Sequence, residues 1–326
     1  MAVAVLATGL LSLTAMAQEF DVQGHRGARG LAPENTLAAF ARALTIGITT
    51  LKLDVGVSRD CIVVVTHGPR LKPETTRRLD GTWLSATGPA VRTLSVEELG
   101  AYDVGRIKPG SRYAARFPDQ TPADGARIPT LKEVIELVRR SGNEKVRLNI
   151  ETKLKPTEPA LTLSPEKFAI AILDVVHALG MTDRVIIQSF DWRTLQEVQR
   201  RAPAVETSYL SAQQNWRDNL RKGEAGPSPW TAGFDLDDFG GSVPRLVKAA
   251  GGRVWSPYYR EVDATQVEEA HDLGLVVKVW TLNEEVRMEA LVDMGVDGII
   301  TDYPHHLRRV LEERGMKVPT PTPVQP

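Results

Sequence analysis

The 326-residue sequence has a single cysteine, Cys61, and almost no net charge. One thiol cannot form an internal disulfide, and it excludes zinc ribbons and iron–sulfur scaffolds, which need several thiolates. Forty basic residues are balanced by 41 acidic ones, giving a formal net charge of −1, so bulk charge does not favour a nucleic-acid partner. After the first residues, no apolar run is long enough to predict a membrane span in the mature chain.

The two ends differ from the rest of the chain. Residues 1–17 are apolar and uncharged and end in Ala15-Met16-Ala17, which predicts a signal peptide and export to the periplasm or beyond. A basic leading segment is missing, so a start site placed too late and a buried helix are the alternatives. Residues 318–326 are proline-rich and predict a disordered tail after a single domain at 18–317.

Between these ends, β-branched runs alternate with helical patterns. Strands are expected at 20–24, 50–55, 146–151, 185–189, 206–210, 253–256, 275–281 and 298–301. Helices are expected at 36–44, 131–140, 165–179, 191–201, 264–273 and 284–294, the last three capped by Asp191, Asp263 and Asn283. Eight βα units predict an α/β fold, a closed (β/α)₈ TIM-type barrel. A doubly wound sheet is the alternative, but no Gly-x-Gly-x-x-Gly turn supports it.

Two segments interrupt this alternation. Residues 68–128 are rich in Gly-Pro and Asp-Gly turns and follow an extra short strand at 62–66, which predicts a small insertion after strand 2. Residues 211–250 are a second irregular region. Insertions after barrel strands lie at the catalytic mouth, so both are expected to shape access to a site.

Charged side chains gather where the predicted strands end. The first strand leads into the GHRG segment at 24–27. Its glycines let the backbone amides approach an anion closely, and the Arg26 guanidinium can bind a phosphate through two hydrogen bonds. In the second strand, a period of two turns Lys52 and Asp54 toward the barrel axis. A barrel keeps its active site at this end, so these residues are candidates for one.

The same rule extends the candidate site to other strands. Glu151 and Lys153 point inward from the third strand, His67 follows the extra strand, and Trp280 ends the seventh, where it can line a substrate pocket. Carboxylates can hold a hard divalent cation, and two imidazoles can serve as acid and base near neutral pH. This combination of carboxylates, imidazoles and cations favours hydrolysis of a phosphate ester.

The order of these motifs resembles the glycerophosphodiester phosphodiesterase family over roughly residues 20–312. The matching segments are HRG at 25–27, PENT at 33–36, LDV at 53–55, His67, ETK at 151–153, SFD at 189–191, WTLN at 280–283 and GVDGIITDYP at 295–304. The resemblance implies a TIM-type barrel with a small insertion, and metal-dependent cleavage of a small glycerophosphodiester. The products would be an alcohol and glycerol 3-phosphate.

The resemblance also implies roles for individual residues. His25 and His67 match the acid/base pair, although which one donates the proton stays open. Arg26 and Lys153 match phosphate contacts. Asp54 and Glu151 match ligands of Ca²⁺ or Mg²⁺.

Lys52 departs from the family pattern, which has Glu-x-Asp on this strand. Gly68 stands where an aspartate usually follows the second histidine, and Cys61 stands where a glycine is common in a turn. An ammonium has donors only and cannot ligate a cation. Near two carboxylates, an ammonium is stabilised by a Coulomb energy of about 4 kcal/mol per close pair, before the cost of desolvation is subtracted. We therefore expect Lys52 to take the place of the metal electrostatically, weakening metal binding and activity.

Three functions stay open at this point. The first is a working phosphodiesterase. The second is an impaired barrel that binds a phosphorylated ligand without efficient turnover. The third is a phospholipase D-like relative acting on lipid headgroups, which no exposed apolar stretch of the sequence favours.

Overall fold

Eight parallel strands close into a barrel in the computed structural model, which describes residues 19–326. The strands are β1 (Asp21–His25), β2 (Thr50–Val57), β6 (Arg147–Thr152), β7 (Val185–Ser189), β8 (Glu206–Ser211), β11 (Val254–Pro257), β12 (Val276–Val279) and β13 (Gly298–Thr301). They follow one another in chain order, and pairing of β1 with both β13 and β2 closes the ring. The predicted barrel is confirmed, while the signal peptide predicted at 1–17 lies outside the described residues.

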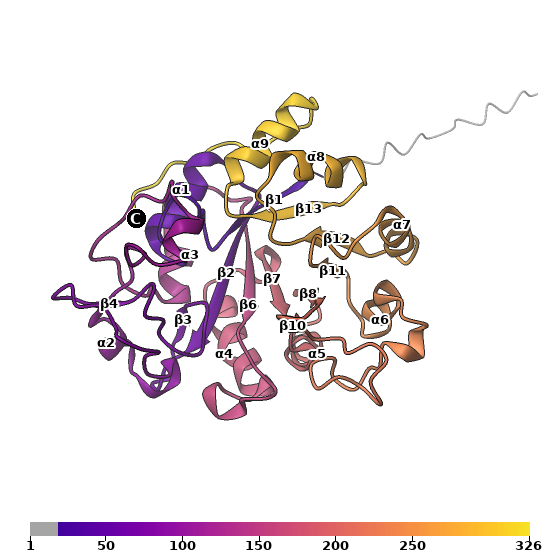
Figure 1. The fold of residues 1–326 in the computed structure, drawn as a ribbon, viewed down its shortest axis with the longest axis horizontal. Helices are drawn as coiled ribbons and strands as arrows, with labels where there is room; N and C mark the ends of the chain where they lie inside the picture. The colour runs from indigo at the N-terminus through magenta and orange to yellow at the C-terminus, as the bar shows by residue number, and fades with distance from the viewer. Residues whose placement is uncertain (1–18) are drawn as a thin grey trace, which may run out of the picture.

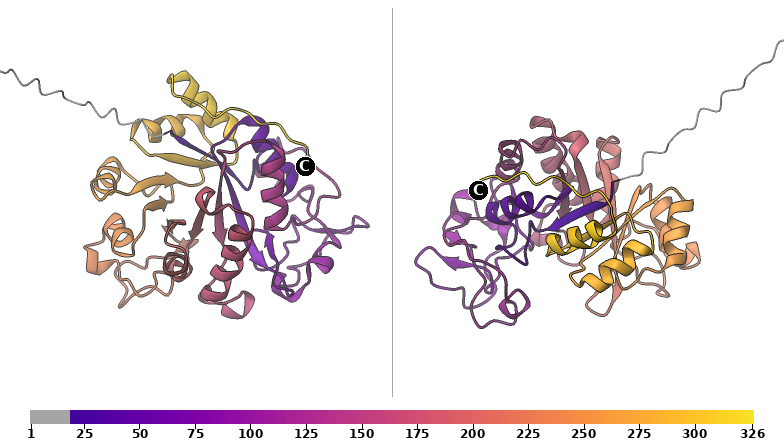
Figure 2. Two further views of the ribbon diagram at one scale, coloured as in Figure 1. Left: turned by 180° about the vertical axis from the view of Figure 1, so that it is seen from behind. Right: turned by 90° about the horizontal axis from the view of Figure 1, so that it is seen from above.

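Helices surround the barrel on its outer side (Figures 1 and 2). They are α1 (Leu37–Ile46), α3 (Leu131–Arg140), α4 (Pro165–Ala178), α5 (Trp192–Arg201), α6 (Val243–Ala249), α7 (Ala264–Asp272), α8 (Glu285–Asp293) and α9 (Pro304–Glu313). Within residues 19–326, none of the helices has the length and apolar character that a membrane crossing requires.

Side-chain caps explain where several helices begin. The side chains of Asp191 and Asp263 accept hydrogen bonds from backbone N–H groups of the first turns of α5 and α7, as predicted. The expected cap at Asn283 is wrong, because Glu284 is the residue that precedes α8. The Asn283 amide instead donates to Asp302 at 2.9 Å, so its hydrogen-bonding capacity is used at the end of β13.

The barrel separates apolar from polar side chains by strand alternation. Leu51 and Leu53 are fully buried in the apolar layer between strands and helices, whereas Lys52 and Asp54, which alternate with them along β2, point inward. Polar groups continue at the other end of the barrel, where Lys278 Nζ lies 2.6 Å from Asp21 Oδ2. The interior is therefore held by paired charges, while hydrophobic burial stabilises the outer layer.

The segment after β2 forms a small lobe beside the barrel, seen near the β4 and α2 labels in Figure 1. β3 (Val63–Val65) pairs antiparallel with β2, and the chain continues through β4 (Arg77–Arg78), η1 (Val91–Thr93), α2 (Val96–Leu99), β5 (Tyr102–Asp103) and η2 (Ala114–Arg116). Val64, Leu71, Val91 and Leu99 form its own buried cluster. This cluster gives the lobe a small core of its own, and the pairing of β3 with β2 joins the lobe to the barrel.

The second irregular region contains more regular structure than the sequence predicts. Short strands β9 (Gln213–Gln214) and β10 (Arg217–Asp218) form a hairpin, and η5 (Asp237–Phe239) precedes α6. The seven-residue helix α6 was not expected, because it is short and follows a long stretch without periodicity. Its Ser242 cap and the proline in its first turn are the local signals for it.

The proline-rich tail makes specific contacts, which corrects the prediction of disorder. It runs from α9 past α1 (Figure 1), where the Thr322 N–H donates to the Leu44 carbonyl at 2.9 Å. Asn143 donates to the Thr322 hydroxyl at 3.2 Å, and Val318 and Val324 pack on the apolar core. Arg308 Nη1 also donates to the Pro319 carbonyl, which is free to accept because extended proline-rich backbone makes no internal hydrogen bonds.

Substitution of Gly27 tests how closely the loop after β1 packs against α1. The φ of Gly27 is +88°, and an added Cβ would lie 2.5 Å from the Ala39 carbonyl carbon. We expect Gly27→Ala to lower the free energy of unfolding by at least about 2 kcal/mol, because it combines backbone strain with overpacking. Urea denaturation measures this loss.

Gly125→Ala is the matched control. Its φ is +83°, but no atom lies within 4 Å of the added Cβ, so only the backbone strain remains. Equal losses for the two variants would contradict the close packing of Gly27 against α1.

Candidate active site

A cavity of about 830 Å³ opens at the carboxyl ends of the barrel strands. Its lining includes these residues predicted from the sequence: His25, Arg26, Lys52, His67, Glu151, Lys153 and Trp280. Asp54 lies directly beneath them and is fully buried. The structure thus brings the predicted candidates together at one mouth.

Lys52 lies at the base of this cavity between two carboxylates. Its Nζ donates to Asp54 Oδ1 and, at 2.6 Å, to Glu151 Oε2. The contact follows from strand register, because Asp54 on β2 is paired with Glu151 on β6. Lys153 adds a second ammonium, 2.6 Å from Glu151 Oε1 and 3.8 Å from Asp54 Oδ1.

These cations determine the charge of Asp54. Burial alone would raise the pKa of its carboxyl group, but Lys52, Arg26 and Lys153 outweigh that effect and hold the pKa well below its usual value. The carboxylate is therefore ionised and accepts hydrogen bonds on both oxygens. Asn35 Nδ2 donates to Oδ2 at 3.1 Å.

The arrangement does not fit a divalent cation. Both carboxylates matching the family's metal ligands are bonded to the Lys52 ammonium, which occupies the space between them. Across residues 19–326, the structure forms no group of three or more His, Cys, Asp or Glu side chains able to hold a metal ion. The ammonium offsets part of the charge of these carboxylates but offers no ligand atom.

Arg26 is held more tightly than the sequence suggests. Its Nη1 donates to Glu34 Oε1 at 2.9 Å, and its Nε lies 3.0 Å from Asp54 Oδ2 without hydrogen-bond geometry. Its backbone has φ +52°, a strained conformation supported by the Asn35 N–H donating to its carbonyl at 3.0 Å. Tyr113 from the insertion also donates to Glu34. Arg26 lines the cavity with its guanidinium already paired.

His25 belongs to a buried network with Asp302. Its Nδ1 lies 2.7 Å from Asp302 Oδ1, and Arg29 donates to both oxygens of that carboxylate at 2.8 Å. Burial and the Arg29 charge lower the pKa of His25 to about 3, despite the opposing effect of Asp302. The ring is thus neutral at neutral pH. Because an ionised carboxylate only accepts, Nδ1 carries the proton and Nε2 keeps its lone pair.

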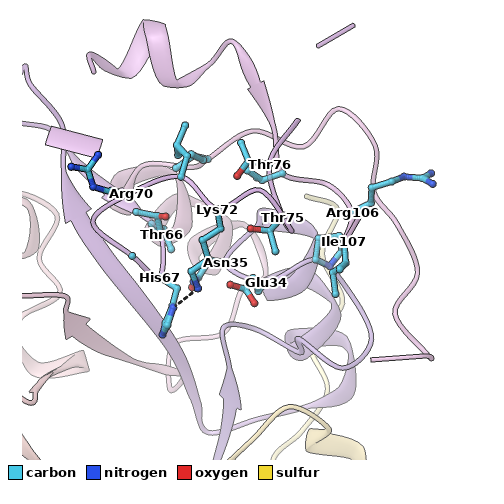
Figure 3. A pocket seen from close by; sticks show the side chains of 16 residues that line it. Glu34, Asn35, Thr66, His67, Arg70, Lys72, Thr75, Thr76, Arg106 and Ile107 are labelled. Atoms are coloured by element: carbon cyan, nitrogen blue, oxygen red, sulfur yellow. Dashed lines mark hydrogen bonds between the residues drawn. The ribbon is translucent and has the colours of Figure 1, made fainter. Parts of the chain in front are cut away.

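His67 has a different partner. Its Nδ1 lies 2.8 Å from Lys72 Nζ, as the dashed line in Figure 3 shows. Gly68 supplies no carboxylate beside it. Burial and the charges of Arg26 and Lys153 hold the pKa of His67 well below its usual value, so this ring is also neutral.

Aromatic side chains form the opposite wall. The ring of Trp280 packs edge-on against Phe190 at 5.4 Å and also contacts Tyr258 and Trp216. Trp216 is 59% exposed and sits on the loop between β9 and β10. The cavity therefore has one side of paired charges and one aromatic side, where the Arg217 guanidinium lies over the rings of Phe190 and Trp230. This division suits a phosphate that bears an organic substituent.

Sequence reasoning missed several residues at this site. Arg29 and Asp302 are separated by 273 positions, and only closure of the barrel brings β13 beside the loop after β1. Lys72 and Tyr113 come from the insertion, which has no periodicity to orient them. The position of Asp302 directly after a strand was the one available signal.

Three comparisons place the chain among known proteins. A sequence model of the glycerophosphoryl diester phosphodiesterase family matches residues 25–306. A glycerophosphodiester phosphodiesterase of Caldanaerobacter subterraneus subsp. tengcongensis is 29% identical over 297 residues, which cover 90% of this chain and 98% of that protein. A crystal structure from Silicibacter pomeroyi, named for the same activity, is 37% identical with a TM-score of 0.81, covering 93% and 96%.

A third relative has a ligand. The structure of an Oleispira antarctica phosphodiesterase in complex with the product sn-glycerol-3-phosphate has a TM-score of 0.64 at 24% identity, covering 89% of this chain and 96% of that one. At this identity the likeness shows the shared fold.

Asp302 gives a pH-dependent prediction for stability. Burial would raise the pKa of its carboxyl group, but Arg29 and His25 hold it well below its usual value. Because this folded-state pKa is lower than the unfolded value of about 3.9, the ionised Asp302 side chain stabilises the folded protein at pH values above about 3.9. We expect Asp302→Asn to cost about 3–5 kcal/mol near neutral pH, and the difference from the unmodified chain to shrink below about pH 4.

Asp124→Asn is the control in the same urea titrations. Asp124 also faces two arginines, Arg77 at 2.7 Å and Arg106, but its side chain is 49% exposed. We expect Asp124→Asn to lose less stability than Asp302→Asn, because solvent screens the ion pairs of Asp124. A pH-independent difference for Asp302→Asn would contradict the predicted ionisation.

Proposed function

Because the chain belongs to the glycerophosphoryl diester phosphodiesterase family, we propose that it hydrolyses glycerophosphodiesters to an alcohol and sn-glycerol 3-phosphate. The observation that carries the proposal is the pair of neutral imidazoles, His25 and His67, facing one cavity beside several cations. The product complex of the Oleispira antarctica relative supports a small-molecule substrate.

The charge of the cavity supports a phosphodiester as its ligand. The ion-paired network around the two histidines has five cationic side chains, those of Arg26, Arg29, Lys52, Lys72 and Lys153, and four anionic ones, those of Glu34, Asp54, Glu151 and Asp302. With both histidines neutral, five minus four leaves one positive charge. The lining adds Arg116, Lys155, Arg217 and Glu284, so the cavity is more positive still, and it attracts a phosphodiester, which carries one negative charge.

Lys52 contributes to this positive charge without a metal. A glutamate at position 52 together with a divalent cation would contribute −1 and +2, which equals the single positive charge of lysine. The ammonium therefore reproduces the net charge of a metal-loaded site while leaving out Lewis-acid chemistry. We propose that phosphate is bound by this fixed charge, chiefly by Lys153, whose side chain is 18% exposed.

Hydrolysis then uses side chains of this chain alone. One imidazole takes a proton from the attacking water as the new O–P bond forms. The other gives a proton to the alcohol oxygen as its bond to phosphorus breaks. Lys153 faces the developing charge on the phosphoryl oxygens. The aromatic wall containing Trp280 shields the organic substituent from water.

Binding without turnover is a second candidate. It is favoured by the ammonium of Lys52, since a site without a Lewis acid binds phosphate but polarises it less. The two candidates differ in product release from the same ligand.

Glycerol 3-phosphate release from glycerophosphocholine separates them. We expect the unmodified protein to release product at the same rate with added Ca²⁺ or Mg²⁺ and with a chelator. Lys52→Glu without metal should lose activity about a hundredfold or more, because it replaces a cation beside the phosphate with a third carboxylate. Added Ca²⁺ or Mg²⁺ should restore part of that activity.

Lys132→Glu is the control, because it makes the same charge change on the exposed face of α3 and should keep full activity. Loss of the unmodified protein's activity on chelation would contradict the metal-free site. Tight binding of glycerophosphocholine with no product under any condition would identify the binding function instead.

A further inference from the structure

Lys72 contacts a site histidine from outside the motifs of the family resemblance. Its Nζ lies 2.8 Å from His67 Nδ1, and Figure 3 shows the side chain reaching to that ring. The neighbouring Leu71 is buried in the insertion core, and its backbone N–H donates to Pro89 O at 3.2 Å. The Gly88 N–H donates back to Leu71 O at 2.9 Å. The main chain therefore sets the position of Lys72.

This contact fixes where the proton of His67 lies. An ammonium has donors only, so Nδ1 must accept and be unprotonated. A neutral ring then carries its proton on Nε2. His25 is arranged in the opposite way, because its Nδ1–H donates to Asp302 and its Nε2 keeps a lone pair. The two rings offer one donor and one acceptor to the cavity that both line.

We propose that Lys72 is a positioning residue that makes His67 the proton donor to the leaving alcohol and leaves His25 as the proton acceptor. The inference rests on the proposed hydrolysis and assigns its two proton-transfer roles. Lys72 thus gives His67 a side-chain partner where Gly68 supplies none, with the hydrogen bond running in the direction opposite to that of a carboxylate.

The proton balance is complete with these groups. Water loses a proton to His25 Nε2 as its oxygen forms the bond to phosphorus. The P–O bond to the alcohol breaks, its electron pair stays on the alcohol oxygen, and that oxygen takes the proton of His67 Nε2. His67 Nδ1 takes a proton from Lys72, so the ring stays neutral and Lys72 becomes an amine. Solvent then returns a proton to His67 Nε2 while the Nδ1 proton goes back to Lys72, and His25 loses its proton to solvent, which restores the starting state.

The surroundings of Lys72 suit this transfer. Burial lowers its pKa to about 8, with Arg26 and Lys153 acting in the same direction and Glu34 and Asp54 opposing them. The ammonium is thus the main form at neutral pH, yet it releases its proton more readily than an exposed lysine. Turnover should fall as the pH rises through about 8, because the amine form cannot supply the proton.

Nitrogen NMR of protein labelled with ¹⁵N-histidine tests the arrangement without substrate. The His67 signals are identified by their loss in His67→Gln. We expect a protonated Nε2 and an unprotonated Nδ1 near neutral pH, with the Nδ1 signal titrating at a midpoint near 8. That titration should be absent from Lys72→Met. Lys72→Arg, which keeps a donor and the charge, should keep the protonated Nε2 without the titration.

Kinetics test the consequence for turnover. In Lys72→Met, kcat should fall at least about tenfold, KM should change little, and the loss of kcat at high pH should disappear. Lys72→Arg should also lack that high-pH loss, because its guanidinium does not release a proton in this range. Lys132→Met removes an exposed lysine on α3 and should match the unmodified enzyme.

The outcomes separate this inference from the proposed function. A His67 ring protonated on Nδ1, or a Lys72→Met enzyme with unchanged kcat and pH profile, would overturn the role of Lys72. If the unmodified protein shows no turnover, the proposed hydrolysis fails and the proton-donor role fails with it. The ring signals then still decide whether Lys72 sets the tautomer.

Discussion

The ammonium of Lys52 lies between two buried carboxylates at the centre of the barrel and offsets part of their charge, and the rest of the site is arranged around that contact. Asp54 and Glu151 face each other across neighbouring strands and would repel each other without a cation between them. Their second oxygens accept bonds from Asn35 and Lys153, which connects the loop after β1 to the end of β6. Removing one partner of such a buried set leaves uncompensated charge and is strongly destabilising.

Two similar networks flank this contact and give the histidines different chemistry. Asp302, oriented by Arg29 and Asn283, accepts the Nδ1 proton of His25. On the other side, Lys72 donates to His67. Both rings are neutral, so their difference lies in which nitrogen carries the proton. The asymmetry comes from the two partners, one a carboxylate and the other an ammonium.

Most of the barrel could be predicted from the sequence, because local pattern determines strand alternation. The β-branched runs marked the eight strands, and a period of two separated Lys52 and Asp54 from their apolar neighbours. The same period turned Glu151 toward the axis, so the charged centre of the site was predictable before its geometry was known. The short helix α6 and the packing of the tail were not, since neither depends on a long periodic segment.

The remaining site residues depend on tertiary contacts. Asp302 meets Arg29 only because β13 pairs with β1 at the closure of the ring. Lys72 reaches His67 only because the insertion core holds the backbone of Leu71. Sequence spacing carries no information about either contact.

Calorimetric titration of the unmodified protein with Ca²⁺ and with Mg²⁺ tests the central claim most directly. With Lys52 between Asp54 and Glu151, we predict no saturable heat of binding for either ion. Binding in the micromolar range would show that the carboxylates are available to a metal, and it would contradict the account.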